Sequence, residues 1–377
     1  MKHFNQRKRK VGLLIDRWFV TPLFFKKNRH QNSYNRSLLI FDFHRIGDIV
    51  LLTALLKSIR NKYRSYKITL VAGQWAKALL ENNPGIIDEI ITFNAPWVTG
   101  QYSLHSILSI VKLIKRLKNK QFEFGIEVRG DLRQILLMYF CGINNIVGYL
   151  FTGGQLIVTH PVPYDNSCQH LIDFHRNISR YLNCPIEHFF PRIWLSEIEE
   201  DKINHYKSKS KKILGIHPGA SNILKVLPCS TIVEVIDEML KKNWKIWIFQ
   251  GPQEEIYVKK IVEKCHTGIH VINTNLRDYI VHIASCTVVL SMDSACGHIA
   301  SALNVPSVVV FGPARYQFCK PIGKKVTIVQ IDNVPCRPCN QKKCIHHQYH
   351  YCMKEVSSEQ IVDQIMSIKS LSKHLHL

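Results

Sequence analysis

Short apolar runs alternate with longer stretches whose apolar residues recur at helical spacing, from residue 37 to about residue 150. This alternation predicts strands and helices in turn. The expected strands are 38–43, 67–71, 86–93, 122–128 and 146–149, and the expected helices are 49–63, 74–81, 104–117 and 132–140. Strands that alternate with helices of this length predict parallel βαβ units.

The pattern loosens between about 150 and 210, where glycines, prolines and a charged run occur, with helices expected at 170–182 and 197–208. A domain boundary is expected near 195–210. Alternation then resumes. The expected strands are 212–217, 245–250, 270–273, 287–291, 307–311 and 326–331, and the expected helices are 230–240, 254–265, 276–284, 297–303 and 358–368.

The chain is therefore expected to hold two doubly wound, Rossmann-like α/β domains, at 37–195 and 210–335, facing a cleft. An extension at 1–36 precedes them, and a Cys-rich loop at 336–352 and a C-terminal helix and tail at 357–377 follow. Ligands of such sheets bind beyond the carboxyl ends of the strands, so the loops there are the candidate sites.

The strongly positive net charge indicates anionic partners. The 377 residues carry a formal net charge of +22, and residues 1–36 hold ten Lys or Arg against one acid. A nucleic acid, a phosphorylated substrate or an acidic membrane would each complement this charge. In the extension, basic clusters flank the apolar runs 11–15, 18–20 and 23–25, which is the composition of an interfacial membrane segment. A solvated tail is the alternative, because Pro22 breaks any single helix there.

The interrupted apolar runs are too short for a transmembrane helix and lack a secretory cleavage site. Eight of the twelve cysteines are scattered singly, which is typical of a reducing cytoplasm. The sequence therefore predicts a cytoplasmic protein, with peripheral membrane attachment as an option.

Four loops at expected strand ends carry candidate chemistry. In the segment 44–48, Gly47 allows a tight turn or the close approach of a ligand, and Asp48 is either a helix N-cap or a catalytic group. In 292–300, a helix start with Ser294 and His298 predicts an anion site, with a simple capped helix as the alternative. Lys225, after the loop 215–221, is a candidate phosphate contact or a solvated lysine.

The fourth loop, 250–255, contains two acidic residues, Glu254 and Glu255. A carboxylate there would accept hydrogen bonds from ribose hydroxyls, or the acids would only complement the helix dipole. Taken together, the three loops of the second half describe a nucleotide pocket.

In this order the motifs resemble those of glycosyltransferase family 9, the bacterial heptosyltransferases of lipopolysaccharide core synthesis. The resemblance spans about 38–368, and its carriers are RIGDIVLLTALLKSIR (45–60), IHPGAS with LKVLP (216–228), QGPQEE (250–255) and MDSACGHIASALNVPSVVVFGP (292–313). It implies a GT-B fold with the nucleotide sugar on the second domain and the acceptor on the first. It also implies an inverting transfer that needs no metal.

Carried over by position, the resemblance makes Asp48 the catalytic base, with Arg45 and Gly47 beside it on the acceptor side. It implies donor-binding roles for a set at four places in the second half, namely Lys225, Glu254 or Glu255, Asp293, and Ser294 with Ala295 and His298. The implied donor is ADP-heptose, and the implied acceptor is a phosphorylated, lipid-linked saccharide at the anionic inner-membrane surface.

The chain departs from the family at two of these motifs. Members often have Gly-Pro at the position of Ala295-Cys296, and Trp in place of Leu227 before Pro228. An alanine still offers its backbone N–H, so phosphate binding is expected to persist, whereas the change at Leu227 bears on the choice of donor.

The Cys-rich loop holds Cys336, Cys339, Cys344 and Cys352, with three histidines among them. Four thiolates within such a short segment suit a tetrahedral metal such as zinc or iron, and similar loops occur in some family members. We expect any such metal to be structural. Free or disulfide-bonded cysteines are the alternative.

Three other functions stay open from the sequence. The same fold could use another nucleotide sugar or a protein acceptor. A basic nucleic-acid-binding protein with a Cys/His metal loop is a remote alternative, because no recognition-helix pattern or known zinc-finger spacing occurs. An oxidoreductase is disfavoured because no Gly-x-Gly-x-x-Gly follows any expected strand.

Overall fold

The computed structural model describes residues 35–165, 167–210, 212–265, 268–339 and 341–373. Residues 1–34 of the basic extension, and with them the expected membrane segment, lie outside the described residues. The chain divides into two compact units, 1–189 and 190–377. The expected boundary at 195–210 falls a few residues later, at the helix α9 (Glu197–Lys209).

In the described part of the first unit, six strands form a parallel sheet in the order β3-β2-β1-β4-β5-β6. The strands are β1 (Asn35–Asp42), β2 (Lys67–Ala72), β3 (Glu89–Thr92), β4 (Phe122–Glu127), β5 (Ile146–Gly148) and β6 (His160–Pro161). The helices are α3 (Ile46–Lys62), α4 (Trp75–Leu80), α5 (Pro96–Thr99), α6 (Leu104–Lys118), α7 (Leu132–Phe140) and α8 (Leu171–Tyr181).

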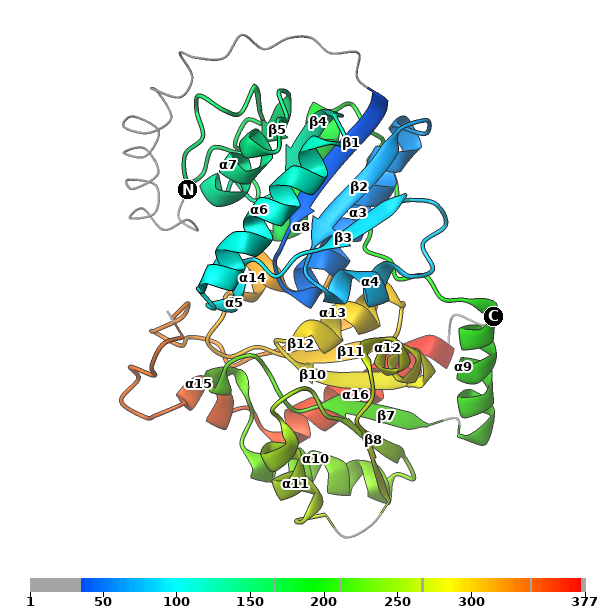
Figure 1. Cartoon of the computed structure of the whole chain (residues 1–377). Helices are drawn as coiled ribbons and strands as arrows, with labels where there is room; N and C mark the ends of the chain where they lie inside the picture. Colours follow the sequence, from blue (N-terminus) through cyan, green and yellow to red (C-terminus); the bar gives the residue numbers. More distant parts are fainter. Residues whose placement is uncertain (1–34, 166, 211, 266–267, 340, 374–377) are drawn as a thin grey trace. The chain divides into compact units, whose positions relative to one another are not determined.

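The central strand β1 is apolar on both faces because helices cover both sides of the sheet. Leu38, Leu39, Ile40 and Phe41 are all fully buried. Figure 1 shows α6 and α7 over one face, and α3 packs with α8 over the other. Leu39 and Phe41 belong to the core that includes Leu117 of α6.

The described part of the second unit repeats the plan. Its parallel sheet has the order β12-β11-β10-β7-β8-β9. The strands are β7 (Ile213–His217), β8 (Lys245–Phe249), β9 (Ile269–Ile272), β10 (Val288–Met292), β11 (Ser307–Val310) and β12 (Val326–Val329). The helices are α9, the short 3₁₀ helix η2 (Ile223–Lys225), α10 (Cys229–Lys241), α11 (Glu255–Val262), α12 (Leu276–Ser285), α13 (Ala295–Ala302), α14 (Tyr316–Cys319), α15 (Tyr351–Lys354) and α16 (Ser358–Lys373).

The last helix, α16, returns to the core of this unit and packs against α10. On the other face, α9 packs against α12, where Arg277 forms an ion pair with the largely buried Glu199. When the second sheet is numbered from β7, its strand order is that of the first sheet. Both orders are that of a Rossmann fold, so the predicted doubly wound architecture is confirmed.

Several element boundaries differ from the predictions for local reasons. The strand expected at 86–93 is only β3, because Gly85 has a left-handed backbone with φ +69° and the chain is still turning there. The helix expected from residue 49 begins at Ile46, and the helix expected from residue 297 begins at Ala295. Among the described residues, none of the helices is both long and apolar enough to cross a bilayer.

Candidate functional site

The candidate residues lie at the switch point of each sheet, where neighbouring strands send their connections to opposite faces. In the first sheet β1 pairs with β4, and in the second β7 pairs with β10. Loops that leave such a pair diverge and open a crevice at the carboxyl ends of the strands. Asp48 follows β1, while Lys225 follows β7 and the segment 293–298 follows β10.

Asp48 is held at both carboxylate oxygens in the first turn of α3. Its Oδ2 accepts a hydrogen bond from the backbone N–H of Arg45 at 3.1 Å, and its Oδ1 lies 2.8 Å from Arg129 Nη2. Arg45 is the N-cap residue, so the expectation that Asp48 is itself the N-cap is wrong. Asp48 is the third helical residue and closes a capping box through its Oδ2, while Arg129 holds its Oδ1.

Gly47 lies in the same helical turn, half-buried, and not in the tight turn that the sequence suggested. The exposed Arg45 precedes the helix with an extended backbone. Both residues therefore border Asp48, and Gly47 leaves the helix start without a side chain beside it.

Arg129 is the cation of this cluster, and it was not predicted from the sequence. It follows β4, and its Nε lies 3.7 Å from Asp42 Oδ2 while its Nη2 pairs with Asp48. Asp42 is fully buried at the end of β1, and its Oδ1 is 2.9 Å from His44 Nδ1. The signal that would have found Arg129 is a charged residue directly beyond a buried strand that neighbours β1.

The guanidinium governs the ionisation of both carboxyls. Burial by itself would raise the pKa of Asp48, and the nearby Asp42 carboxylate adds to this. Arg129 outweighs both and holds the pKa of Asp48 below its usual value. Burial likewise opposes ionisation of Asp42, yet Arg129 and His44 keep its pKa low. Asp48 is thus an ionised acceptor of protons at neutral pH.

Glu127, the last residue of β4, shapes the loop that carries Arg129. Its fully buried carboxyl accepts hydrogen bonds from the backbone N–H groups of Arg129 and Gly130. Burial, with a smaller contribution from Asp131, raises the pKa of Glu127 to about 8. The loop is therefore fixed from within the sheet.

In the second unit, Lys225 and Asp293 form an ion pair. Lys225 Nζ lies 2.6 Å from Asp293 Oδ2, and both side chains are nearly buried. Lys225 ends η2, whose first turn is capped by the Asn222 side chain. The alternative of a solvated lysine is therefore wrong, because Asp293 holds the ammonium beside the start of α13.

The start of α13 presents the other predicted donor contacts. Ser294 is its N-cap residue, but the Ser294 hydroxyl hydrogen-bonds to Ser291 at 3.0 Å and does not cap the helix. Ser294 and Ala295 are half-buried, whereas His298, one turn later, is 9% exposed. Uncapped N–H groups at a helix start, beside a lysine, favour an anionic ligand.

The structure distinguishes the two candidate glutamates. Glu254 Oε2 accepts a hydrogen bond from the Gly251 N–H at 2.7 Å, and its Oε1 lies 3.6 Å from His217 Nε2. Glu255 is exposed in the first turn of α11, where it complements the helix dipole. Only Glu254 is thus turned toward the β7 loop.

His217 and Tyr279, which were not predicted from the sequence, form a chain of contacts that ends at Glu254. His217 Nδ1 lies 3.2 Å from the Tyr279 hydroxyl. Burial lowers the pKa of His217 against the opposing effect of Glu254, so the imidazole is neutral at pH 7. Both residues therefore position Glu254 without adding positive charge.

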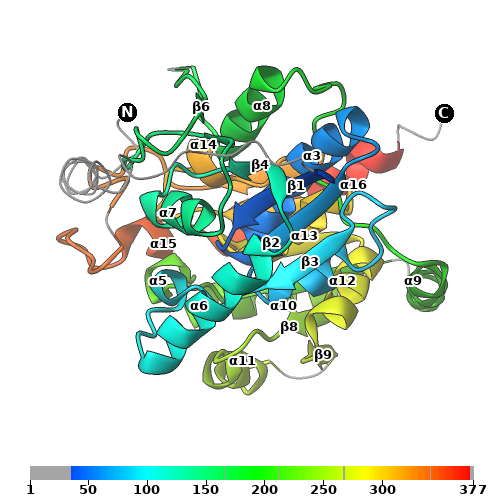
Figure 2. The ribbon, with the colours of Figure 1, turned by 45° about the horizontal axis from the view of Figure 1, so that its top comes forward.

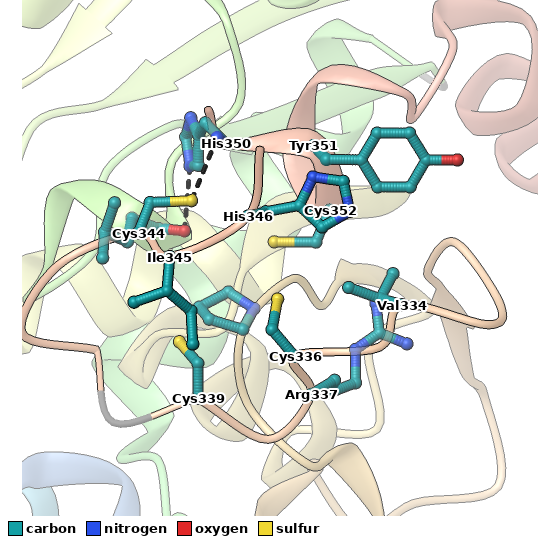
Figure 3. A pocket seen from close by; sticks show the side chains of 12 residues that line it. Val334, Cys336, Arg337, Cys339, Cys344, Ile345, His346, His350, Tyr351 and Cys352 are labelled. Carbon is teal, nitrogen blue, oxygen red and sulfur yellow. Dashed lines mark hydrogen bonds between the residues drawn. The ribbon is translucent and has the colours of Figure 1, made fainter. Parts of the chain in front are cut away.

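The four cysteines of the Cys-rich loop line one cavity together with His346, His350 and Tyr351 (Figure 3). The sulfurs of Cys344 and Cys339 accept backbone N–H groups of His350 and Gln341 at 3.2 and 3.4 Å. Within the described residues, no group of three or more His, Cys, Asp or Glu is arranged as a set of metal ligands. All four cysteines are free thiols, so the disulfide alternative is wrong.

The loop is tied to the segment that carries Lys225. His350 Nε2 lies 2.9 Å from the Leu224 carbonyl, and the Asn222 side chain donates to the Gln341 carbonyl at 2.7 Å. The Cys-rich loop is therefore hydrogen-bonded to η2 and to its N-cap residue.

Comparison with known proteins identifies the family. The sequence model described as glycosyltransferase family 9 (heptosyltransferase) matches residues 110–350. The chain belongs to glycosyltransferase family 9. It is therefore a glycosyltransferase, and the expected family is confirmed.

A curated relative of this family 9 chain is lipopolysaccharide heptosyltransferase 2 of Escherichia coli K12. The two are 20% identical over 340 residues, which cover 86% of this chain and 95% of the relative. The solved structure of the E. coli ADP-heptose lipopolysaccharide heptosyltransferase II is similar with a TM-score of 0.73 at 18% identity, covering 89% of this chain and 99% of that one. This likeness confirms the GT-B fold type.

A more distant structural neighbour is described as the iron-containing dodecameric glycosyltransferase TibC from enterotoxigenic E. coli. Its TM-score is 0.56 at 12% identity, and the match covers 91% of this chain and 81% of that one. At this identity the likeness concerns the fold alone.

We predict that Arg129→Gln destabilises the first unit by about 3–5 kcal/mol at neutral pH, because it leaves two carboxylates without their cation. Low folded-state pKa values contribute stability above the usual carboxyl pKa and lose that contribution as pH falls through the folded values. The difference between variant and wild type should therefore be largest above about pH 4 and shrink below it. Chemical unfolding at several pH values measures this.

Arg133→Gln is the matched control, because Arg133 is half-exposed, pairs with its neighbour Asp131 and otherwise lies over the Trp97 ring at 5.5 Å. It should cost about 1 kcal/mol or less. Equal losses in both variants, or a loss for Arg129→Gln that does not depend on pH, would contradict the assignment.

Proposed function

We propose that this glycosyltransferase moves a heptosyl group from ADP-heptose onto a saccharide of the lipopolysaccharide core, with inversion at the anomeric carbon. The observation that carries the proposal is the convergence of Lys225, Asp293 and the start of α13 at the switch point of the second sheet. The printed names of the E. coli relatives, which specify ADP-heptose and lipopolysaccharide, support the choice of donor and acceptor.

In this proposal Asp48 is the general base. Its carboxylate takes the proton of the acceptor hydroxyl as that oxygen attacks the anomeric carbon. The lowered pKa of Asp48 means that the base is unprotonated at neutral pH, although burial opposes this. Arg129 and the Arg45 N–H fix the orientation of the carboxylate, so little reorganisation accompanies proton transfer.

The leaving ADP gains negative charge on its diphosphate as the glycosidic bond breaks. Backbone N–H groups at the start of α13, including that of Ala295, are suited to this charge together with Ser294, His298 and Lys225. Asp293 keeps Lys225 beside the helix start before the donor arrives. Glu254 is suited to accept hydrogen bonds from the ribose hydroxyls.

We place the reaction at the cytoplasmic face of the inner membrane, with the chain attached peripherally. A phosphorylated, lipid-linked acceptor is found at such a surface, and the net charge of +22 suits both the acceptor and anionic lipids. The main alternative is the same fold with another nucleotide sugar or a protein acceptor, to which the departure at Leu227 is relevant.

We further propose that Cys336, Cys339, Cys344 and Cys352 hold a structural zinc or iron ion. The chemistry of the donor set supports this proposal, since four thiols line one cavity and two of the sulfurs accept backbone N–H groups, as metal-bound thiolates do. Because the described side chains are not arranged as a set of ligands, the proposal requires the thiols to turn toward a common centre when the ion binds. Burial and the neighbouring cysteines raise the pKa of Cys352 to about 11. A bound cation would attract the thiolate and so lower this pKa. Transfer itself needs no metal in this proposal.

A donor panel tests the proposed function. ADP-heptose should be turned over with a kcat/KM at least about a hundredfold above that for UDP- and GDP-sugars, because adenine and heptose contacts are both lost in the latter. The measurement is release of the nucleoside diphosphate with a core saccharide acceptor. A preference for a UDP- or GDP-sugar would favour the alternative donor, and transfer to a protein alone would favour the alternative acceptor.

Asp48→Asn should lower kcat by about 10²–10⁴-fold, because the amide still accepts the Arg45 N–H but takes no proton. The Kd for ADP should stay within about threefold, since the donor contacts lie in the second unit. Lys225→Ala serves as the converse control and should weaken ADP binding. Near-normal turnover by Asp48→Asn would refute the base assignment.

The purified full chain should contain about one equivalent of zinc or iron, and the double variant Cys336→Ser/Cys339→Ser should lose it. Because the loop supports η2, hydrogen exchange at 222–225 should become faster in that variant. Cys319→Ser, outside the cavity, is the control and should change neither readout. A metal content well below one equivalent in the wild type rejects the metal site.

A further inference from the structure

Helix α6 carries apolar side chains on two sides, and the fold uses only one of them. Leu113 and Leu117 are buried in the core of the first unit. Leu104 and Ile107 on the outer side are 81% and 59% exposed, and Tyr102 just before the helix is equally open to solvent. Figure 1 and Figure 2 both show α6 on the outside of this unit.

The outer apolar side chains form one stripe. Leu104, Ile107, Leu108 and Val111 are exposed and lie at intervals of three and four residues, so they share a helix face. Other exposed large apolar residues, such as Ile198 in α9 and Ile256 in α11, are single residues on otherwise polar faces. A single one needs no explanation, but a contiguous apolar patch indicates an interaction surface.

The charge along α6 indicates what that surface meets. The helix contains no acidic residue, and its C-terminal half carries Lys112, Lys115, Arg116 and Lys118. Arg116 pairs with Glu89, whereas Lys112, Lys115 and Lys118 are exposed beside the end of the stripe. Along the outer side of α6, the N-terminal half is thus apolar and the C-terminal half is basic.

We propose that this outer side of α6, from Tyr102 to Lys118, is a docking surface for an anionic lipid bilayer. The apolar half would enter the boundary between headgroups and acyl chains, and the lysines would meet lipid phosphates. A protein partner would need an acidic patch opposite the lysines and an apolar groove opposite the stripe. A second copy of this basic surface offers no such acidic patch, so charge favours the bilayer.

This inference rests on the peripheral membrane attachment in the proposed function and deepens it, because it names the surface that binds the bilayer. It also differs from attachment through the N-terminal extension at 1–36, since the surface is formed by residues 102–118. Docking through α6 would hold that unit at the membrane in a fixed orientation.

The test is flotation of the full chain with vesicles of phosphatidylcholine, with and without phosphatidylglycerol. Leu104→Ser/Leu108→Ser should lower the partition coefficient on anionic vesicles about tenfold or more. Lys112→Gln/Lys115→Gln should lower it by about fivefold per lysine and reduce the preference for phosphatidylglycerol. Hydrogen exchange of the wild type should slow over 104–118 when anionic vesicles are added.

Ile198→Ser is the matched control, a single exposed isoleucine in another helix, and should partition as the wild type does. All variants should unfold at the wild-type temperature and keep normal turnover with a water-soluble acceptor, because the altered side chains are exposed. That readout separates failure of the docking surface from failure of the proposed transfer.

Two results would overturn the inference. One is unchanged vesicle binding in both double variants, which would assign membrane attachment to another segment such as the extension. The other is a change from dimer to monomer by light scattering in Leu104→Ser/Leu108→Ser with unchanged vesicle binding, which would make the stripe an interface between two copies.

Discussion

The hydrogen-bonded pairing of two parallel strands at the centre of each sheet determines where the chemistry of this chain lies. Where β1 lies against β4, and β7 against β10, the chain leaves neighbouring strand ends toward opposite faces. The loops from these ends are far apart in sequence but adjacent in space. Asp48 meets Arg129 in this way, and Lys225 meets Asp293. Without these pairings, each candidate group would be an isolated charged residue on a loop.

The two units use charge in different ways. In the first, one guanidinium serves two carboxylates, Asp42 and Asp48, so both stay ionised at neutral pH although burial opposes ionisation. In the second, Lys225 is already paired with Asp293, and the His217 imidazole beside Glu254 is neutral at pH 7. Under the proposed function, the leaving diphosphate would be stabilised there by oriented N–H groups at the start of α13, which cost no reorganisation when a ligand arrives.

Periodicity predicted both sheets, because a buried parallel strand must be apolar on both faces, as in 38–43. Position after a strand then predicted Asp48, Lys225 and the 293–298 segment. Arg129 was missed because its role depends on which strand neighbours β1, and strand order is not encoded by local spacing. The choice between Glu254 and Glu255 likewise required the fold. Only Glu254 has its carboxylate against Gly219 and Gly251, which lie on two separate loops. Cysteine spacing suggested a structural metal site, which stays a prediction, and it gave no indication of the contact between that loop and η2.

The Glu254 carboxylate lies against two backbone positions that have no side chain. A Cβ placed on Gly219 would lie 1.9 Å from Glu254 Oε1, and one on Gly251 would lie 2.8 Å from Oε2. The Glu254 carboxylate therefore occupies space that is free because Gly219 and Gly251, on the loops after β7 and β8, have no side chain. A side chain at 219 or 251 would therefore collide with Glu254, so a larger residue at either position requires a shorter one at 254. If Glu254 holds the donor ribose as proposed, the choice of residue at all three positions is coupled to donor binding.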